Sequence, residues 1–159
     1  MIGTGLARSK SGRATLRGGD VNAKAKILVV DDEEVVRRCF VRTLSDQQCN
    51  VEVAWNGPDA LLAMEQQPFD VVLLDQRMPG MDGMDVLETI KQKWPESEVI
   101  MITGYPAVES AKRAVTLGAY DYLAKPVGPD EVINAANGAM MHKRWALRCE
   151  PPVGRAGAR

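Results

Sequence analysis

Four short apolar runs in this chain each end on polar residues, and this repeated pattern constrains the fold more strongly than any other feature. Runs of this length and hydrophobicity are typical of parallel β-strands whose two faces are both covered. Because ligands of open parallel sheets bind beyond the carboxyl ends of the strands, we expect the polar residues to converge on one pocket. The runs and the residues that follow them are 27–30 with Asp31 and Asp32, 71–74 with Asp75, 99–102 with Thr103, and 120–124 with Lys125 and Pro126.

Segments with helical periodicity separate these runs. Val36, Phe40 and Leu44 recur at intervals of four residues and form one apolar face. Pro106 is expected to open the fourth helix, and Gly118 to close it. Five alternating strand and helix units predict an α/β fold with a five-stranded parallel doubly wound sheet. The expected bounds, each within about two to four residues, are strands at 26–31, 50–54, 70–74, 98–102 and 120–124, and helices at 34–47, 57–67, 83–94, 106–118 and 129–148.

Length and composition bound the organisation of the chain. Its 159 residues suffice for one domain, which we place at 24–148 between a flexible basic tail at 1–23 and a second tail at 149–159. The net charge of −1 argues against a nucleic-acid-binding polycation. The basic tail leaves contact with nucleic acid or membrane open, but a solvated tail is the simpler interpretation. No apolar stretch approaches the roughly 20 residues that cross a bilayer.

Cysteine and histidine content excludes some kinds of site. The three cysteines are far apart and form no CxxC pair, which disfavours a zinc site and favours a reduced, cytoplasmic compartment. His142 is the only histidine, so a His-rich metal site is excluded.

Three carboxylates in one pocket require a compensating cation, because like charges that lie close together raise one another's pKa. Asp31, Asp32 and Asp75 offer the oxygen ligands that Mg²⁺ prefers. An alternative for the acidic stretch 31–34 is that it only caps the following helix, whose first turn favours negative charge. Asp75 at a corresponding strand end favours the metal interpretation.

The same pocket suits phosphoryl transfer. A carboxylate can act as the nucleophile and form an acyl phosphate, and Asp75 fits that role because it ends a strongly apolar strand. Lys125 and Thr103 would supply a positive charge and a hydroxyl donor for phosphoryl oxygens. Taken singly, a threonine or lysine at a strand end is more often structural or solvated.

These residues resemble the receiver domains of bacterial two-component response regulators over about residues 24–148. The resemblance implies that Asp75 accepts a phosphoryl group from a histidine kinase in the cytoplasm. Asp31, Asp32, Asp75 and the backbone carbonyl of Arg77 would bind Mg²⁺. The matching segments are Val29–Glu33, Leu74–Gly83, Ile102–Tyr105 and Gly118–Pro126, whose Lys125–Pro126 bond matches a cis peptide of the family.

The resemblance also implies a switch. After phosphorylation, Thr103 would move toward the phosphoryl group and the ring of Tyr122 would turn inward behind it. The signal would then leave through the fourth helix, fifth strand and fifth helix, either to an unknown output protein or to a second copy in a homodimer. A simpler alternative for Tyr122 is packing at a strand edge.

Two further hypotheses stay open. The segment after the last helix is too short for a helix-turn-helix unit, so we expect a stand-alone receiver without direct DNA binding. The alternative is a receiver fragment of a longer DNA-binding transcriptional regulator.

We expect a phosphoacceptor and not an enzyme. A phosphatase of the aspartyl-phosphate type needs an acid two residues after its nucleophile, where this chain has Arg77.

Overall fold

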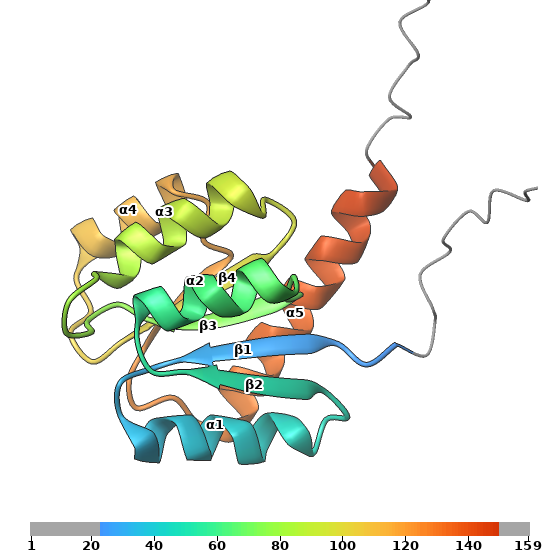
Figure 1. Ribbon diagram of the computed structural model, residues 1–159, viewed down its shortest axis with the longest axis horizontal. Helices are drawn as coiled ribbons and strands as arrows, with labels where there is room; N and C mark the ends of the chain where they lie inside the picture. The colour runs from blue at the N-terminus through green and yellow to red at the C-terminus, as the bar shows by residue number, and fades with distance from the viewer. Residues whose placement is uncertain (1–22, 150–159) are drawn as a thin grey trace, which may run out of the picture.

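Strands and helices alternate along the chain in the computed structural model, which describes residues 23–149 (Figure 1). The predicted tails at 1–23 and 149–159 lie outside these residues, apart from Ala23 and Cys149. The strands are β1 (Lys26–Val30), β2 (Asn50–Ala54), β3 (Val71–Asp75), β4 (Glu98–Thr103) and β5 (Asp121–Ala124). The helices are α1 (Glu34–Ser45), α2 (Gly57–Gln66), α3 (Gly83–Lys93), α4 (Val108–Thr116) and α5 (Pro129–Cys149).

The five strands form one parallel sheet in the order β2-β1-β3-β4-β5. This arrangement confirms the predicted α/β fold with a five-stranded parallel doubly wound sheet. In the register of the sheet, Val30 lies beside Leu74 and Asp75 lies beside Ile102. The chain therefore brings the ends of β1, β3 and β4 to one edge.

Helices cover both faces of the sheet, as Figure 1 shows. The strands alternate strictly: Leu28 and Val30 pack under α2, α3 and α4, whereas Ile27 and Val29 pack under α1 and α5. Residues 27–30 of β1 and every residue of β3 are therefore buried whichever face they point to, which accounts for the apolar runs 27–30 and 71–74.

The prediction that all four apolar runs are buried on both faces is wrong for the fifth strand. Every residue of β3 and β4 is buried, but none of β5 is, because β5 is an edge strand with one neighbour. The fourth helix begins at Val108, within the margin of the predicted start at 106, but Pro106 does not open it. Ala107 is extended and precedes α4, so Pro106 lies in the loop. Gly118 does end this helix, with a positive φ of 96°.

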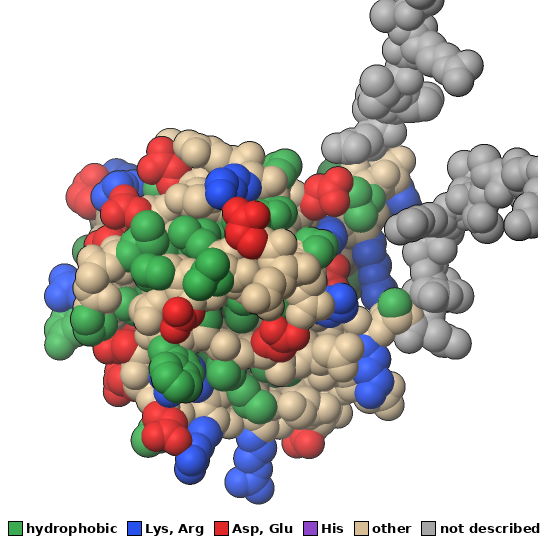
Figure 2. Space-filling view, in the orientation of Figure 1, with side chains coloured by type: hydrophobic (Ala, Val, Ile, Leu, Met, Phe, Trp, Pro, Cys, Tyr) green, Lys and Arg blue, Asp and Glu red, His purple; other side chains and the backbone are tan. Residues whose placement is uncertain are grey.

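The outer surface carries charged side chains of both signs, and Figure 2 shows hydrophobic side chains among them over α2. Met141 and Trp145, on the last turns of α5, are also largely exposed. Within the described part of the chain, no helix combines the length and the apolar character that crossing a membrane requires.

Candidate functional site

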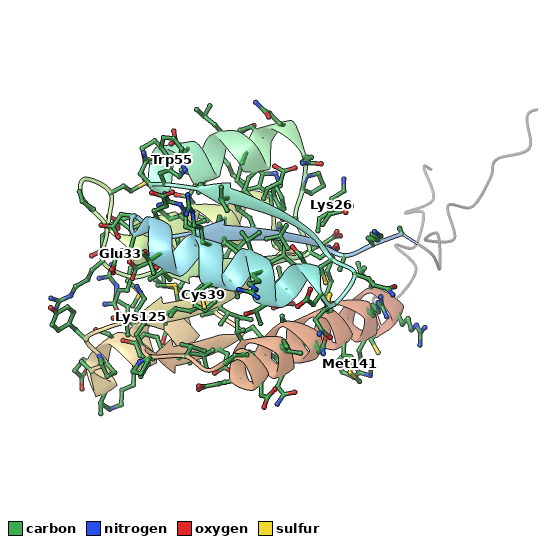
Figure 3. All side chains as sticks on the ribbon, turned by 90° about the horizontal axis from the view of Figure 1, so that it is seen from below. Lys26, Glu33, Cys39, Trp55, Lys125 and Met141 are labelled. Atoms are coloured by element: carbon green, nitrogen blue, oxygen red, sulfur yellow. The ribbon has the colours of Figure 1, made fainter. Side chains whose placement is uncertain are left out.

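The predicted polar residues lie at the carboxyl edge of the sheet. Glu33 and Lys125 lie at one end of the molecule, whereas Lys26 and Met141 lie at the other (Figure 3). Asp75 is the last residue of β3, and Asp31 follows β1 directly. The topology thus explains why residues almost a hundred positions apart in the sequence meet here.

Asp31, Asp32 and Asp75 form one acidic cluster. Each offers a carboxylate oxygen, and the three oxygens lie within 4.8 Å of one another. The side chains of Asp31 and Asp75 are buried, whereas Asp32 is exposed. A cluster with two buried members and one exposed member is accessible to an ion from solvent.

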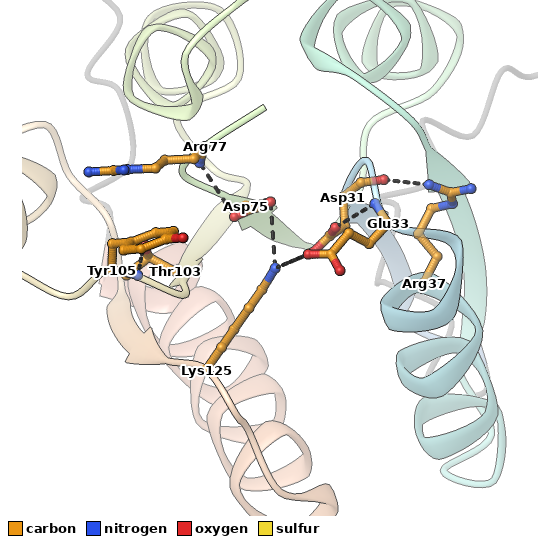
Figure 4. Close-up of polar contacts among 8 residues, drawn as sticks. All are labelled: Asp31, Glu33, Arg37, Asp75, Arg77, Thr103, Tyr105 and Lys125. Carbon is orange, nitrogen blue, oxygen red and sulfur yellow. Dashed lines mark hydrogen bonds and ion pairs between the residues drawn. The ribbon is translucent and has the colours of Figure 1, made fainter. Parts of the chain in front are cut away.

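Lys125 is the positive charge of the pocket (Figure 4). Its Nζ donates a hydrogen bond to Asp31 Oδ2 at 2.9 Å and lies 3.5 Å from Asp75 Oδ2. Glu33 Oε1 lies 3.7 Å from the same Nζ atom. The bond between Lys125 and Pro126 is cis, as the family resemblance implied.

The charges of the pocket oppose one another. Burial, and then the neighbouring carboxylate of Asp31, raises the pKa of Asp75 to about 6, although Lys125 acts in the opposite direction. Burial by itself would lower the pKa of Lys125, but its hydrogen bond to Asp31 and the nearby carboxylates outweigh burial and raise it. Lys125 therefore stays charged at neutral pH, while Asp75 ionises less readily than an ordinary aspartate.

The raised pKa predicts how stability depends on pH without divalent cations. In the unfolded chain Asp75 titrates near 3.8, and in the folded protein near 6. Folding therefore strengthens proton binding, so this stabilisation is complete below about pH 4 and is lost as the pH rises through 6. Relative to Asp75→Asn, we expect wild-type protein to lose about 1–3 kcal/mol of unfolding free energy between pH 4 and pH 7.

Urea titrations of both proteins at a series of pH values, in a chelating buffer, measure this difference. Asp85→Asn, at an exposed aspartate of α3, is the matched control. A constant difference between wild type and Asp75→Asn across the pH range would contradict the predicted ionisation.

Thr103 and Tyr122 do not join the contacts of the cluster. Thr103 is fully buried, and its hydroxyl accepts a hydrogen bond from the Tyr105 backbone N–H at 3.1 Å. Tyr122 packs against the core under α2, α3 and α4, and its hydroxyl donates to Gln76 Oε1 at 2.8 Å. Their predicted roles in a switch stay predictions.

Three residues that contact the site were not predicted. Glu33 approaches Lys125, and Arg37 donates from Nη1 to the Asp31 carbonyl at 2.7 Å while lying over the ring of Trp55. Gln76 directly follows Asp75 in the sequence. Adjacency to a predicted ligand was the available signal for Glu33 and Gln76. No sequence spacing predicts the contact of Arg37 with the Asp31 carbonyl, because this contact depends on how α1 is oriented relative to the end of β1.

Arg77 lies beside the acceptor carboxylate. Its backbone N–H donates to Asp75 Oδ1 at 3.4 Å, and its guanidinium lies 4.4 Å from the centre of the Tyr105 ring. In Figure 4 the backbone of Arg77 lies beside Asp75, and its side chain extends away from this carboxylate toward Tyr105. The predicted role of the Arg77 carbonyl as a metal ligand stays a prediction.

Together, the sheet order and the acidic pocket with its lysine define a class of small flavodoxin-like α/β domains. The sequence from 27 to 137 matches the response regulator receiver domain. The chain belongs to this family, as predicted from its sequence motifs.

Known relatives and solved structures agree with this assignment. A putative NtrX-like response regulator of Rickettsia bellii is 39% identical over 67% of this chain, and NtrC of Salmonella typhimurium, a DNA-binding transcriptional regulator, is 37% identical over 73%. The chain spans about a quarter of the length of these relatives, 23% and 25% respectively.

Two solved structures have the same fold. A receiver domain from Clostridium thermocellum has a TM-score of 0.73 and 34% identity, with 77% of this chain and 98% of that chain covered. NtrX from Brucella abortus has a TM-score of 0.75 and 34% identity, with 79% and 29% covered.

Proposed function

We propose that this receiver takes a phosphoryl group onto Asp75 from a histidine kinase and passes the signal on by changing its protein contacts. The observation that carries the proposal is the position of Asp75, which is 5% exposed, directly beside Lys125 and Asp31. A carboxylate so placed can act as a nucleophile that a lysine and a metal-binding cluster support.

The donor atoms fit Mg²⁺. The cluster consists of carboxylate oxygens within 4.8 Å of one another, and hard oxygen ligands suit this ion. Asp31, Asp32 and Asp75 would hold it, with the Arg77 backbone carbonyl as the proposed fourth protein ligand. When bound, Mg²⁺ supplies positive charge that offsets the carboxylates and the phosphoryl oxygens.

The remaining residues would bind and orient the transferred group. A carboxylate oxygen of Asp75 forms a bond to phosphorus as the phosphorus–nitrogen bond of the kinase phosphohistidine breaks and the imidazole leaves. Lys125 would exchange part of its contact with Asp31 for a phosphoryl oxygen, since its Nζ already lies within 3.5 Å of Asp75. Thr103 would release the Tyr105 N–H and donate its hydroxyl to another phosphoryl oxygen.

The protein would thus be a cytoplasmic phosphoacceptor that assists its own phosphorylation and dephosphorylation, and not an enzyme acting on free substrates. An output protein or a second copy would read the surface of α4, β5 and α5. Val108 and Val115 are exposed on α4, which supports that assignment. We propose no membrane contact and no direct binding of DNA by this domain.

Labelling by a small phosphodonor tests the proposal. Wild-type protein incubated with acetyl phosphate and Mg²⁺ should gain one phosphoryl group per chain, measured by intact mass, and should gain none in a chelating buffer. Glu88→Gln, at an exposed residue of α3, is the control and should label normally. Equal labelling with and without Mg²⁺ would contradict the proposed metal site.

The lifetime of the phosphoprotein should depend on Arg77 and Tyr105. The backbone N–H of Arg77 contacts Asp75 and the Arg77 side chain stacks on Tyr105, so we propose that these two bulky neighbours hinder the approach of water to the acyl phosphate. We expect slow loss of the phosphoryl group from wild type after donor removal, and loss several-fold faster from Arg77→Ala and from Tyr105→Ala. Arg42→Ala, at an exposed arginine of α1, should match wild type. A wild-type phosphoprotein that survives only seconds would contradict this prediction.

A second candidate function is regulation of transcription by a longer protein of which this receiver is one part. The observation that favours it is the length of the relatives, of which the chain spans about a quarter, together with the name of NtrC. An immunoblot of source cells with an antibody against the receiver tests it. A band several times larger than this chain supports the longer regulator, and a band at its own size supports the stand-alone receiver.

A further inference from the structure

A hydrogen bond links the proposed switch tyrosine to the residue that follows the acceptor. Tyr122 lies beside Met101 in the sheet, and Met101 lies beside Leu74, so the three share one face. Gln76, two residues after Leu74, projects to the same side, where its Oε1 accepts from the Tyr122 hydroxyl at 2.8 Å. The contact spans β4 and joins two residues 46 positions apart.

Gln76 is itself firmly placed. Its backbone N–H donates to the Ile102 carbonyl at 3.0 Å, and its own carbonyl accepts from the Gly83 N–H at 2.9 Å. The peptide bond joins it directly to Asp75. The acceptor for the tyrosine hydroxyl is therefore fixed to the same short segment that carries the proposed phosphorylation site.

In this unmodified protein, Tyr122 already has the position that the proposed switch gives it after phosphorylation, whereas Thr103 does not. The ring of Tyr122 is already turned toward the core, where it packs against the cluster under α2, α3 and α4. The Thr103 hydroxyl still accepts the Tyr105 N–H, and within residues 23–149 it makes no hydrogen bond to the side chain of Asp75 or of Lys125. Here the inward ring does not depend on movement of Thr103.

We propose that Gln76 is a positioning residue that holds Tyr122 inward before phosphorylation, so that phosphorylation has only Thr103 left to move. The inference rests on the proposed function of Asp75. An inward ring that phosphorylation also favours lowers the cost of binding a phosphoryl group, because a ligand gains affinity when its preferred state is already populated.

The position of the ring can be measured directly. The chain has three tyrosines, so ¹⁹F NMR of protein labelled with 3-fluorotyrosine gives few signals, and Tyr122→Phe assigns one of them. We expect the wild-type Tyr122 signal to change little on adding Mg²⁺ and beryllofluoride, a phosphoryl mimic. In Gln76→Leu the signal should move toward that of a solvent-exposed ring, and beryllofluoride should restore it.

Binding of beryllofluoride supplies the second readout. Gln76→Leu and Tyr122→Phe should each weaken its affinity by about twofold to tenfold, the range expected for one neutral hydrogen bond. The double variant should be no weaker than either single variant, because the two substitutions remove the same contact. Gln76→Glu keeps an acceptor oxygen and should keep the inward signal. Gln92→Leu, at an exposed glutamine of α3, is the matched control.

An unchanged Tyr122 signal in Gln76→Leu would overturn the proposal, as would additive losses of affinity in the double variant. Failure of the proposed function gives a different result. In that case beryllofluoride binds no variant, while the tyrosine signal of the unmodified proteins still decides whether Gln76 holds the ring.

Discussion

The Asp75→Asn variant should take up no phosphoryl group from acetyl phosphate in the presence of Mg²⁺, whereas wild type should take up one. The amide of asparagine is a far weaker nucleophile than a carboxylate. The substitution also removes one of the three carboxylates of the acidic cluster. Lys125 and Asp31 lie within reach of the same position, so the variant keeps the pocket and loses the reacting atom. Intact mass and radiolabel from a labelled donor both measure the loss.

This variant should remain folded, which makes the result interpretable. Replacing Asp75 by a neutral side chain removes a buried carboxylate whose pKa is raised to about 6, so its unfolding free energy at pH 7 should exceed that of wild type. Asp85→Asn should label like wild type. Labelling that persists in Asp75→Asn would show that another residue is the acceptor.

The Gly83→Ala variant should be severely destabilised. A Cβ at Gly83 would lie 2.3 Å from the Asp75 carbonyl oxygen and 2.7 Å from the Gln76 Cα. Both are backbone atoms, so no side-chain rotation relieves the clash. Alanine favours a helix over glycine by about 1 kcal/mol, but overpacking against backbone costs more. We expect a net loss of about 2 kcal/mol or more in unfolding free energy, measured by urea titration, together with slower labelling of the displaced Asp75.

Gly128→Ala is the matched control for this substitution. Gly128 precedes α5 and has no positive φ, and no atom of residues 23–149 lies within 4 Å of its added Cβ. Its unfolding free energy should stay within about 0.5 kcal/mol of wild type. A Gly83→Ala protein as stable as the Gly128→Ala protein would contradict the close approach of α3 to the end of β3.

Much of this architecture follows from local sequence. Apolar runs such as Val71–Leu74 are typical of a strand covered on both faces, and a parallel sheet must collect its strand ends at one edge. Asp31, Asp75 and Lys125 could therefore be predicted to converge, and their contacts at 2.9–3.5 Å agree with that prediction.

What local sequence did not predict depends on the order of the strands and the angles of the helices. The run 120–124 looks like the central strands, and only its position at the sheet edge leaves it half exposed. The contact of His142 with the buried Glu98, at 2.9 Å, joins α5 to β4 across 44 residues. Gln76, which follows β3, and Tyr122 on β5 also meet across β4, and local sequence does not specify that β3 and β5 lie on either side of β4.

Reductive trapping of the labelled protein tests the central claim most directly. An acyl phosphate on an aspartate is reduced by borohydride to homoserine, which peptide mass spectrometry locates in the sequence. The proposed function predicts one reduced residue, Asp75, formed only when Mg²⁺ and the phosphodonor are both present. Homoserine at another aspartate, or a stable phosphate on a serine or threonine with Asp75 intact, would contradict it.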